Sequence, residues 1–448
     1  MLLFMLFIDI LTQRKMQTIS YNKQLDVRAS YDVVVAGSGP AGICAAVAAA
    51  REGAKVALVE RYGVVGGNLT AGYVGPILGM VGKGTMRDEI VSLLGVPEND
   101  MIGETGRAHD FERAKMLLAQ FVNHPNIDVY LQTTVTDVIK EGNAVVGLVV
   151  TAGEGQFVIK GAVTVDATGD GLVSYLAGAQ TEKGREDGLM QPVTLEFTIA
   201  GVDESKGIIC IGDVDEVKLG DERFLDYCKR LAVEGEIPEK IAAVRLHPMV
   251  YDGYRQVNTT QVNGVDMTRV EQIFKADLEL REQMYLLEDF FHKHIPGYEN
   301  CRVISSGTTT GVRETRRVIG DYVITAEELA AGCRFDDVIV HRAEFIVDIH
   351  NPAGSGQAEE HIQYCDPYDL PYRCFTPKGV ENLYTAGRCI SGTHRAHASY
   401  RVMSICMAMG EAVGIAAALC AAEGVTPREL DVKKLQKSLT DKGIELYG

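Results

Sequence analysis

The chain has 448 residues, 46% of them hydrophobic, which is enough for two closely connected domains around a large core. A formal net charge of −17, without any Lys- and Arg-rich stripe, argues against nucleic acid as a partner. The ten cysteines include no C-x-x-C pair, so a disulfide framework, a metal site and a redox-active dithiol are all unsupported.

We expect residues 1–30 to be an N-terminal extension. Their first eleven, MLLFMLFIDIL, are apolar, but the run is too short to span a bilayer and contains Asp9. It also lacks the basic start and small-residue cleavage site of a signal peptide. We expect a dispensable segment with Met16 as the true start, and a weak membrane anchor is the alternative. With free thiols, this predicts a cytoplasmic protein without a membrane span.

Residues 31–60, YDVVVAGSGPAGICAAVAAAREGAKVALVE, have the pattern of a complete βαβ unit. A buried strand over 33–36 leads into a glycine turn and an alanine-rich helix that ends near Gly53. A second strand over 55–59 then delivers Glu60, about 20 residues after the turn, where a carboxylate can bind ribose hydroxyls. The unit predicts an α/β, Rossmann-like dinucleotide-binding domain, but it does not choose between FAD and NAD.

The turn itself reads G-x-G-x-x-G. Gly37 permits the tight turn, Gly39 lets the backbone approach a pyrophosphate, and Gly42 allows close packing of helix on strand. The loop that follows Glu60, RYGVVGGNLT, is glycine-rich and contains no histidine. We expect this loop to contact the cofactor through its backbone, and we expect the cofactor to be dissociable; an ordinary surface turn is the alternative.

The first domain continues to residue 184. A helix is predicted over 111–121, a strand over 127–139 and a strand pair around two later glycines. The strand over 163–166 then enters a second glycine turn, where the backbone can approach the cofactor again. Asp170 in this turn has two open interpretations, which are binding a hydroxyl and capping the next helix.

Residues 185–365 are predicted to form an inserted α+β domain that closes over the first. It contains a strand over 193–199 and a long helix over 268–292. One face of that helix has an apolar stripe that indicates core packing, formed by Ile273, Leu280, Met284, Leu287 and Phe291.

Near the end of the insert, three arginines occur within five positions, which is a pattern that can bind a carboxylate. We keep Arg313 as a candidate and expect Arg316 and Arg317 to form ion pairs on a solvated face, with partners such as Glu314 or Asp321. His350 follows an alternating strand and is either catalytic or interfacial.

Residues 366–448 return to the first domain. A short strand over 383–386 precedes Gly387, and a long helix of small residues is predicted from Arg401. Between them lies a loop with an unusual density of titratable groups, which favours binding of an anionic or enolate-like group. Its members are Arg388, Cys389, His394, Arg395, His397 and Arg401.

Taken together, these segments resemble the FAD-dependent oxidoreductases with a glutathione-reductase-type FAD domain, related to the succinate dehydrogenase and fumarate reductase flavoproteins. The resemblance covers residues 31–423 and rests on VVVAGSGPAGICAA with Glu60, on GVVGGNLT, VDATGDG and GVRETRRVIGDY, and on the segment from DLPYRCFTPKG to GEAVGIAAA.

By this resemblance FAD is the cofactor, with the backbone of Val135 on the adenine, Glu60 on the ribose and the start of the last helix against the flavin pyrimidine. The remaining residues assigned to FAD are Gly37, Gly39, Pro40, Ala41, Gly42, Arg61, Gly66, Gly67, Asn68, Ala167, Thr168, Gly169, Gly387, Arg388, Val402, Met403 and Ser404.

For the substrate, the segment from His397 to Arg401 is similar to an H-x-x-x-R segment of the fumarate-reductase-like proteins, whose arginine holds a carboxylate. His394 is a possible acid or base, and the further candidates are Arg373, His350 and Arg313. We therefore expect hydride transfer between flavin N5 and a small anionic substrate, with an unknown electron partner. The alternatives are flavin-dependent group transfer of the tRNA-modifying type and a non-catalytic flavin-binding protein.

Overall fold

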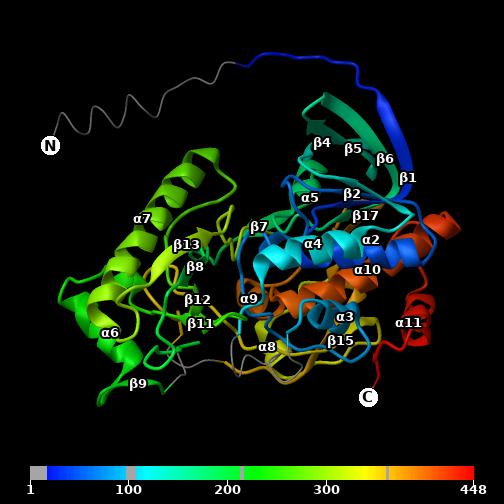
Figure 1. Cartoon of the computed structure of the whole chain (residues 1–448). Helices are drawn as coiled ribbons and strands as arrows, with labels where there is room; N and C mark the ends of the chain where they lie inside the picture. The colour runs from blue at the N-terminus through cyan, green and yellow to red at the C-terminus, as the bar shows by residue number, and fades with distance from the viewer. Residues whose placement is uncertain (1–17, 97–106, 212–215, 360–362, 448) are drawn as a thin grey trace.

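The computed structural model describes residues 18–96, 107–211, 216–359 and 363–447. The expectations for residues 1–15 and Met16 lie outside the described residues. Figure 1 shows one lobe built around a seven-stranded sheet with long helices against it, and a second lobe that carries α6 and α7.

The main sheet has the strand order β3-β2-β1-β6-β5-β4, and β17 pairs with β6. β1, β2, β3, β6 and β17 run parallel, whereas β4 and β5 are antiparallel additions. The carboxyl ends of the parallel strands therefore meet at one edge, which is where ligands bind in such sheets. The strands are β1 (Val27–Ala36), β2 (Val56–Val59), β3 (Ile127–Tyr130), β4 (Thr134–Glu141), β5 (Ala144–Ala152), β6 (Gly155–Asp166) and β17 (Leu383–Thr385).

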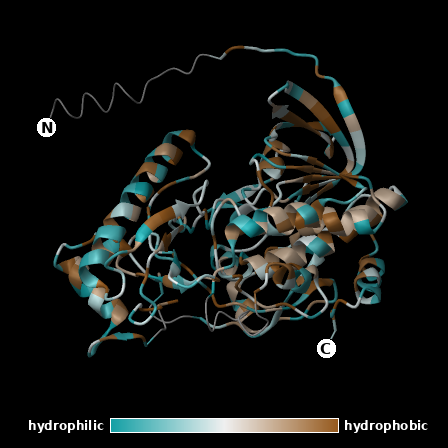
Figure 2. Cartoon of the chain, viewed as in Figure 1, coloured by the Kyte–Doolittle hydropathy of each residue, from teal (hydrophilic) through white to brown (hydrophobic). Residues whose placement is uncertain are grey.

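Two helices of small apolar residues pack together against this sheet. They are α2 (Pro40–Arg51) and α10 (Met403–Glu423), and Figure 2 colours most of α10 hydrophobic. Among the described helices, α10 alone is long and apolar enough for a membrane span, but 83% of its most apolar window is buried inside the protein. Its apolar surface is thus used in the core. The outer helices are α3 (Met86–Leu93), α4 (Phe111–Val122), α5 (Leu172–Leu176) and α11 (Val432–Asp441).

The second lobe has its own antiparallel sheet, in the order β11-β12-β8-β13, and its own hydrophobic core with α6 (Phe224–Val233) and α7 (Val270–His294). The predicted stripe on α7 is buried except for Ile273, which is 40% exposed. The four strands are β8 (Phe197–Ala200), β11 (Leu246–Pro248), β12 (Tyr254–Val257) and β13 (Arg302–Ser306).

This second core draws on residues between Val193 and Cys301, whereas Ile324, Leu329 and Val347 pack into the core of the first lobe. We therefore propose to place the second boundary of the inserted domain well before residue 365. The elements that follow the second core are β14 (Arg316–Val318), which pairs with β7 (Thr181–Lys183), then α8 (Ala326–Ala330), β15 (Val338–Ala343) and β16 (Tyr368–Pro371).

Several predicted elements were wrong in their bounds. The first strand begins at Val27 rather than at residue 33, so its start lies inside the predicted extension 1–30, where it already pairs with β6. The strand predicted over 127–139 is divided into β3 and β4, because the chain turns at Gln132, whose φ is +50°. The strand predicted over 193–199 is regular only from Phe197. The helix predicted from Arg401 is preceded by a separate α9 (His394–Tyr400), and α10 begins only at Met403 because Val402 is extended, with ψ of 156°.

Candidate active site

A cavity of 1160 Å³ lies where the parallel strands end. After β1, Gly37 turns the chain with φ of +93°, and an added Cβ there would lie 2.5 Å from the carbonyl oxygen of Ala167 after β6. A Cβ on Gly42 would overlap the carbonyl of Gly37, whereas a Cβ on Gly39 would meet nothing within 4 Å. The first and third glycines thus hold the turn together, and the second keeps space open.

Glu60 ends β2 at the same edge and lines this cavity. Its carboxylate accepts hydrogen bonds from the Ser38 N–H (2.8 Å), the Ser38 hydroxyl (2.6 Å) and the Tyr62 N–H (2.9 Å). The acidic side chain therefore ties β2 to the glycine turn after β1.

The glycine-rich loop folds back over the turn. The N–H of Gly66 donates to the carbonyl of Ser38 (2.8 Å), and both Gly66 and Gly67 have positive φ, which favours glycine there. His109 supports the loop from below, since its two ring nitrogens lie 2.7 and 2.9 Å from the carbonyl oxygens of Leu69 and Gly75. The loop is thus held beside the cavity, and its residue Asn68 lines the cavity wall.

Asp170 follows the second glycine turn and also lines the cavity. Its carboxylate accepts from Arg388 (3.0 Å) and from the hydroxyl of Thr315 (2.9 Å). The helix-capping interpretation is wrong, because α5 has Gly171 as its N-cap residue and no side-chain cap.

A second cavity of 690 Å³, here called the chamber, shares Asn68, Val312, Arg388, Arg401 and Met403 with the first. The two spaces are therefore neighbours at the N-terminal end of α10.

The roof of the chamber is a polar face formed by Thr194, Glu196 and Asn258, which lie just before β8 and just after β12. Along the chain leading into β8, apolar side chains such as Leu195 and Phe197 point into the core of the second lobe. Thr194 and Glu196, which alternate with them in the sequence, face the opposite way, because successive side chains of extended backbone alternate. Thr194 and Glu196 are only 3% and 4% exposed, so this polar face is buried against the first lobe.

The floor of the chamber consists of Asp348, His350 and Arg401. Nη2 of Arg401 donates to the Asp348 carboxylate (2.9 Å), and Nε2 of His350 lies 3.4 Å from the same carboxylate. Burial, with the charge of Arg313, lowers the pKa of His350 to about 4, so its ring is neutral at pH 7. Although burial opposes it, the neighbouring His350 and Arg401 hold the pKa of Asp348 well below its usual value.

Arg313 lies between roof and floor. Its Nη1 donates to the Pro192 carbonyl (3.0 Å) and to the hydroxyl of Thr194, while Nε and Nη2 donate to none of the described residues. Burial lowers the pKa of Arg313 to about 10, which leaves it a cation at pH 7. The Nε of Arg401 is likewise buried without a described partner. The chamber thus contains guanidinium groups with donors left for a ligand.

Comparison with known proteins identifies the family. The family described as FAD dependent oxidoreductase matches residues 32–439, which is most of the chain. The chain belongs to the FAD-dependent oxidoreductase family.

The curated relatives match over shorter stretches. Soluble pyridine nucleotide transhydrogenases of Chromohalobacter salexigens and Mycobacterium tuberculosis are 35% identical over 99 residues and 37% identical over 101 residues. These segments cover 21% and 22% of this chain and 20% of each relative, so the chain spans about a fifth of the length of the relatives it matches.

Among solved structures, a geranylgeranyl bacteriochlorophyll reductase-like protein from Thermoplasma acidophilum aligns with 15% identity and a TM-score of 0.44, over 92% of this chain and 84% of that one. The p-nitrophenol 4-monooxygenase of Pseudomonas putida aligns with 10% identity and a TM-score of 0.45, over 92% and 85%.

FAD fits the larger cavity. The open space at Gly39 leaves room for a pyrophosphate against the N-terminus of α2, and Val135 from β4 lines the far part of the cavity. Most residues that the sequence assigned to FAD line this space. They are Gly37, Gly39, Pro40, Ala41, Glu60, Arg61, Gly67, Asn68, Val135, Ala167, Thr168, Gly169, Gly387, Arg388 and Met403.

Four assigned residues do not line the cavity. Gly42 and Gly66 support the turn and the loop from outside, and Val402 lines the chamber instead. Ser404 is buried on α10, where its hydroxyl accepts from Nε of Arg87 (3.4 Å), so its side chain faces α3.

Three of the six candidates for substrate chemistry, Arg313, His350 and Arg401, line the chamber. The other three line neither cavity. Arg373 is half-exposed and forms an ion pair with Asp337 (2.9 Å). His397 is buried, and desolvation and nearby arginines hold its pKa well below its usual value.

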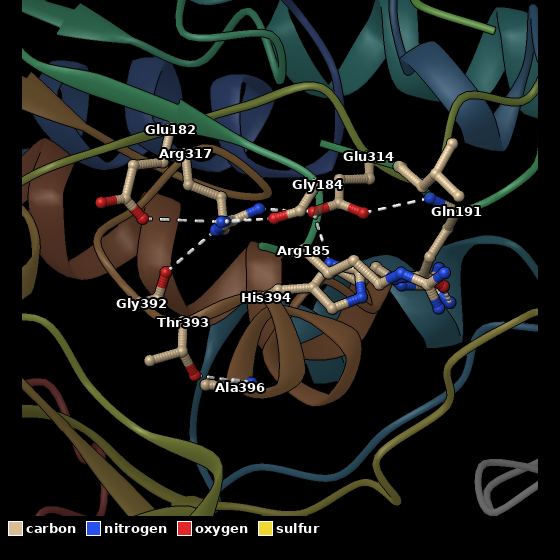
Figure 3. A network of polar contacts seen from close by, with 12 residues as sticks. Glu182, Gly184, Arg185, Gln191, Glu314, Arg317, Gly392, Thr393, His394 and Ala396 are labelled. Atoms are coloured by element: carbon tan, nitrogen blue, oxygen red, sulfur yellow. Dashed lines mark hydrogen bonds and ion pairs between the residues drawn. The ribbon is translucent and has the colours of Figure 1, made fainter. Parts of the chain in front are cut away.

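His394 belongs to a buried network centred on Glu314, shown in Figure 3. The Glu314 carboxylate accepts from Nδ1 of His394 (2.9 Å), from the Gln191 N–H (3.1 Å) and from Arg317. The predicted partner of Arg317 is confirmed, but the pair is buried rather than solvated. Arg316 forms no ion pair with any residue that the structure describes. It lies over the Tyr175 ring, 4.2 Å from its centroid. This network joins the insert to the start of α9.

Sequence reasoning missed Glu196, Asp348, Asn258 and Gln191, whose amide oxygen accepts from the N–H of His350 (3.2 Å). The available signal was alternation: in VTLEFTIA, polar residues alternate with apolar ones. A polar stripe on a strand with a complete apolar stripe must face either solvent or a site.

Proposed function

We propose that this FAD-dependent oxidoreductase transfers hydride between flavin N5 and a small anionic substrate that binds in the chamber. The observation that supports the proposal is an unbalanced positive charge beside the cofactor cavity. Arg313 and Arg401 are cations, and Asp348 is the one ionised carboxylate of the floor.

The neighbouring groups do not cancel this charge. His350 is neutral, burial raises the pKa of Glu196, and Arg388 is already paired with Asp170. A buried cation without a partner is costly, so a carboxylate or enolate in the chamber offsets the desolvation of the arginines. The positive N-terminal end of α10, beginning at Met403, adds to the same potential.

Each group has a distinct task in this proposal. The free donors of Arg313 and Arg401 bind and orient the anion, and the carboxylate of Asp348 holds Arg401 in position. The roof excludes water from the space between the lobes. When bound, FAD supplies two-electron hydride chemistry at N5.

The first experiment is acid precipitation of the FAD-loaded protein, where yellow colour in the supernatant establishes a dissociable cofactor. The oxidised holoenzyme is then titrated with acetate, pyruvate and malonate while the flavin absorbance is recorded. The proposal predicts saturable spectral changes, and anaerobic bleaching or reoxidation by a member of a wider carboxylate panel.

Variants locate the binding site. We expect Arg313→Met and Arg401→Gln each to weaken carboxylate binding at least tenfold, or about 1.4 kcal/mol, while FAD is retained. Arg373→Gln serves as the matched control, because this arginine lies outside both cavities. If no carboxylate perturbs the flavin, or if Arg373→Gln has the largest effect, the proposed site is wrong.

A further inference from the structure

The chamber contains one acid that no ion pair holds. Of the carboxylates among its described lining residues, Asp348 pairs with Arg401, whereas Glu196 receives a hydrogen bond from the amide of Gln256. Glu196 is 4% exposed and lies on the roof, so it reaches the chamber from a different lobe than the floor groups.

The hydroxyl and imidazole groups that line the chamber are less suited than Glu196 to act as the acid. The hydroxyl of Thr194 accepts from Arg313. His350 lies against Asp348 and has a pKa of about 4, so it is not an imidazolium acid at pH 7. His394 and His397, the acids or bases expected from the sequence, line neither cavity.

We propose that Glu196 exchanges a proton with the substrate in the chamber while Arg313 and Arg401 hold the anionic group. This inference rests on the proposed function and adds the acid–base group that a hydride transfer to a polar double bond requires. Burial supports it, because desolvation raises the pKa of the carboxyl to about 8 against the opposing charge of Arg313.

In the reducing direction, reduced FAD bound in the larger cavity would supply the hydride that forms a C–H bond at the substrate carbon, and the π electron pair would move to the neighbouring atom. The O–H bond of Glu196 breaks, and its proton bonds to that atom. Glu196 is left as a carboxylate and takes up a proton from solvent. The substrate thus gains two electrons and two protons, and in the oxidising direction ionised Glu196 accepts the proton.

The test is the pH dependence of anion binding to the oxidised holoenzyme, which needs no turnover. Acetate is ionised throughout the range from about pH 6.5 to about 9, so only protein groups change its affinity. The charged or titratable side chains around Glu196, on the roof and in the rest of the chamber lining, are Arg245, His247, Arg313, Asp348, His350, Arg388 and Arg401.

Below its pKa Glu196 is neutral and tolerates an anion, and above it the ionised carboxylate repels one. We expect the Kd of acetate, or of malonate if it binds more tightly, to rise about tenfold across this range in the wild type. In Glu196→Gln the Kd should stay flat within about twofold. Glu234→Gln, an exposed position on the second lobe, is the matched control and should follow the wild type.

The outcomes separate the two proposals. If neither the wild type nor either variant binds an anion, the proposed function is overturned, and this inference with it. Binding with the same pH dependence in Glu196→Gln overturns the inference alone. If that variant does not retain FAD, the wild-type profile still decides, because a flat Kd from about pH 6.5 to about 9 contradicts an ionisable Glu196 in the site.

Discussion

Gly39 and Gly42 lie three residues apart in one turn, but they constrain the protein in different ways. The space around Gly39 is open and its φ of −65° suits any residue, whereas Gly42 has no room for a side chain beside the carbonyl of Gly37. One glycine is thus required for the ligand and the other for the fold.

Gly39→Ala should therefore leave the protein folded and weaken FAD binding at least tenfold, because the new methyl group enters the pyrophosphate space. Fluorescence titration of the apoprotein with FAD, together with the Tm, measures both effects. Gly153→Ala, in an open surface turn, is the matched control and should change neither. A large loss of Tm in Gly39→Ala would contradict this division of roles.

His350 gives a prediction on stability and pH. Its pKa is about 6.5 in an unfolded chain and about 4 in the folded protein, so between these values only the unfolded chain takes up the proton. Its contribution to the free energy of unfolding is complete above about pH 6.5 and is lost as the pH falls toward 4, by up to about 3 kcal/mol.

In His350→Asn this contribution is absent, so the free energy of unfolding should decline less steeply between about pH 6.5 and about 4. The difference between the two slopes should correspond to about one proton taken up on unfolding. Urea unfolding at several pH values measures the slopes. His124→Asn, at a turn before β3, is the control and should keep the wild-type slope. If the free energy of unfolding has the same slope against pH in the wild type and in His350→Asn, the His350 ring is not held in its neutral form by burial.

At the scale of elements, the placement of α10 depends on two glycines that let it touch α2. A Cβ on Gly410 or Gly414 would overlap the backbone carbonyl of Ala41 or Ala45. This contact places the start of α10, at Met403, against both cavities. A helix–helix contact thus sets the position of the chain that lines both cavities.

Gly414→Ala should destabilise the protein by about 2 kcal/mol or more, although alanine favours a helix over glycine by about 1 kcal/mol. The overlap pushes α10 away from α2, so FAD affinity should fall as well. Chemical denaturation and FAD titration test this, again beside Gly153→Ala. A gain in stability would mean that helix propensity, rather than packing, dominates at this position.

At the scale of the whole molecule, an acidic surface encloses a basic chamber. The net charge is −17, yet Arg313, Arg388 and Arg401 meet in the chamber lining. The positive charge is therefore local and buried, suited to a small anion rather than to a polyanion that needs a broad basic surface.

The protein should consequently pass through a heparin column at about 0.1 M salt and bind to an anion exchanger. This outcome separates hydride transfer to a small substrate from the tRNA-modifying alternative. Retention on heparin at that salt concentration, with release at higher salt, would favour the alternative. The cytoplasmic location expected from the sequence remains a prediction.

The sequence by itself determined the cofactor half of this protein. The glycine turn, Glu60 and the second turn at Ala167 are close in the chain to the strands that present them, so local pattern specifies their place at the sheet edge. Periodicity also predicted the long helix of the insert. It missed the break at Val402, because neither Gly nor Pro marks this break in the sequence.

Only the tertiary structure brought together the chamber that we propose as the substrate site. Glu196, Arg313, Asp348 and Arg401 come from four separate segments that meet when the insert closes on the first lobe. Local density of titratable groups favoured His394 and His397. A buried glutamate binds His394, and neither histidine is among the described residues that line the two cavities of the site. The physical reason is that charged side chains serve equally well as structural partners and as ligand donors, and only packing shows which donors remain free.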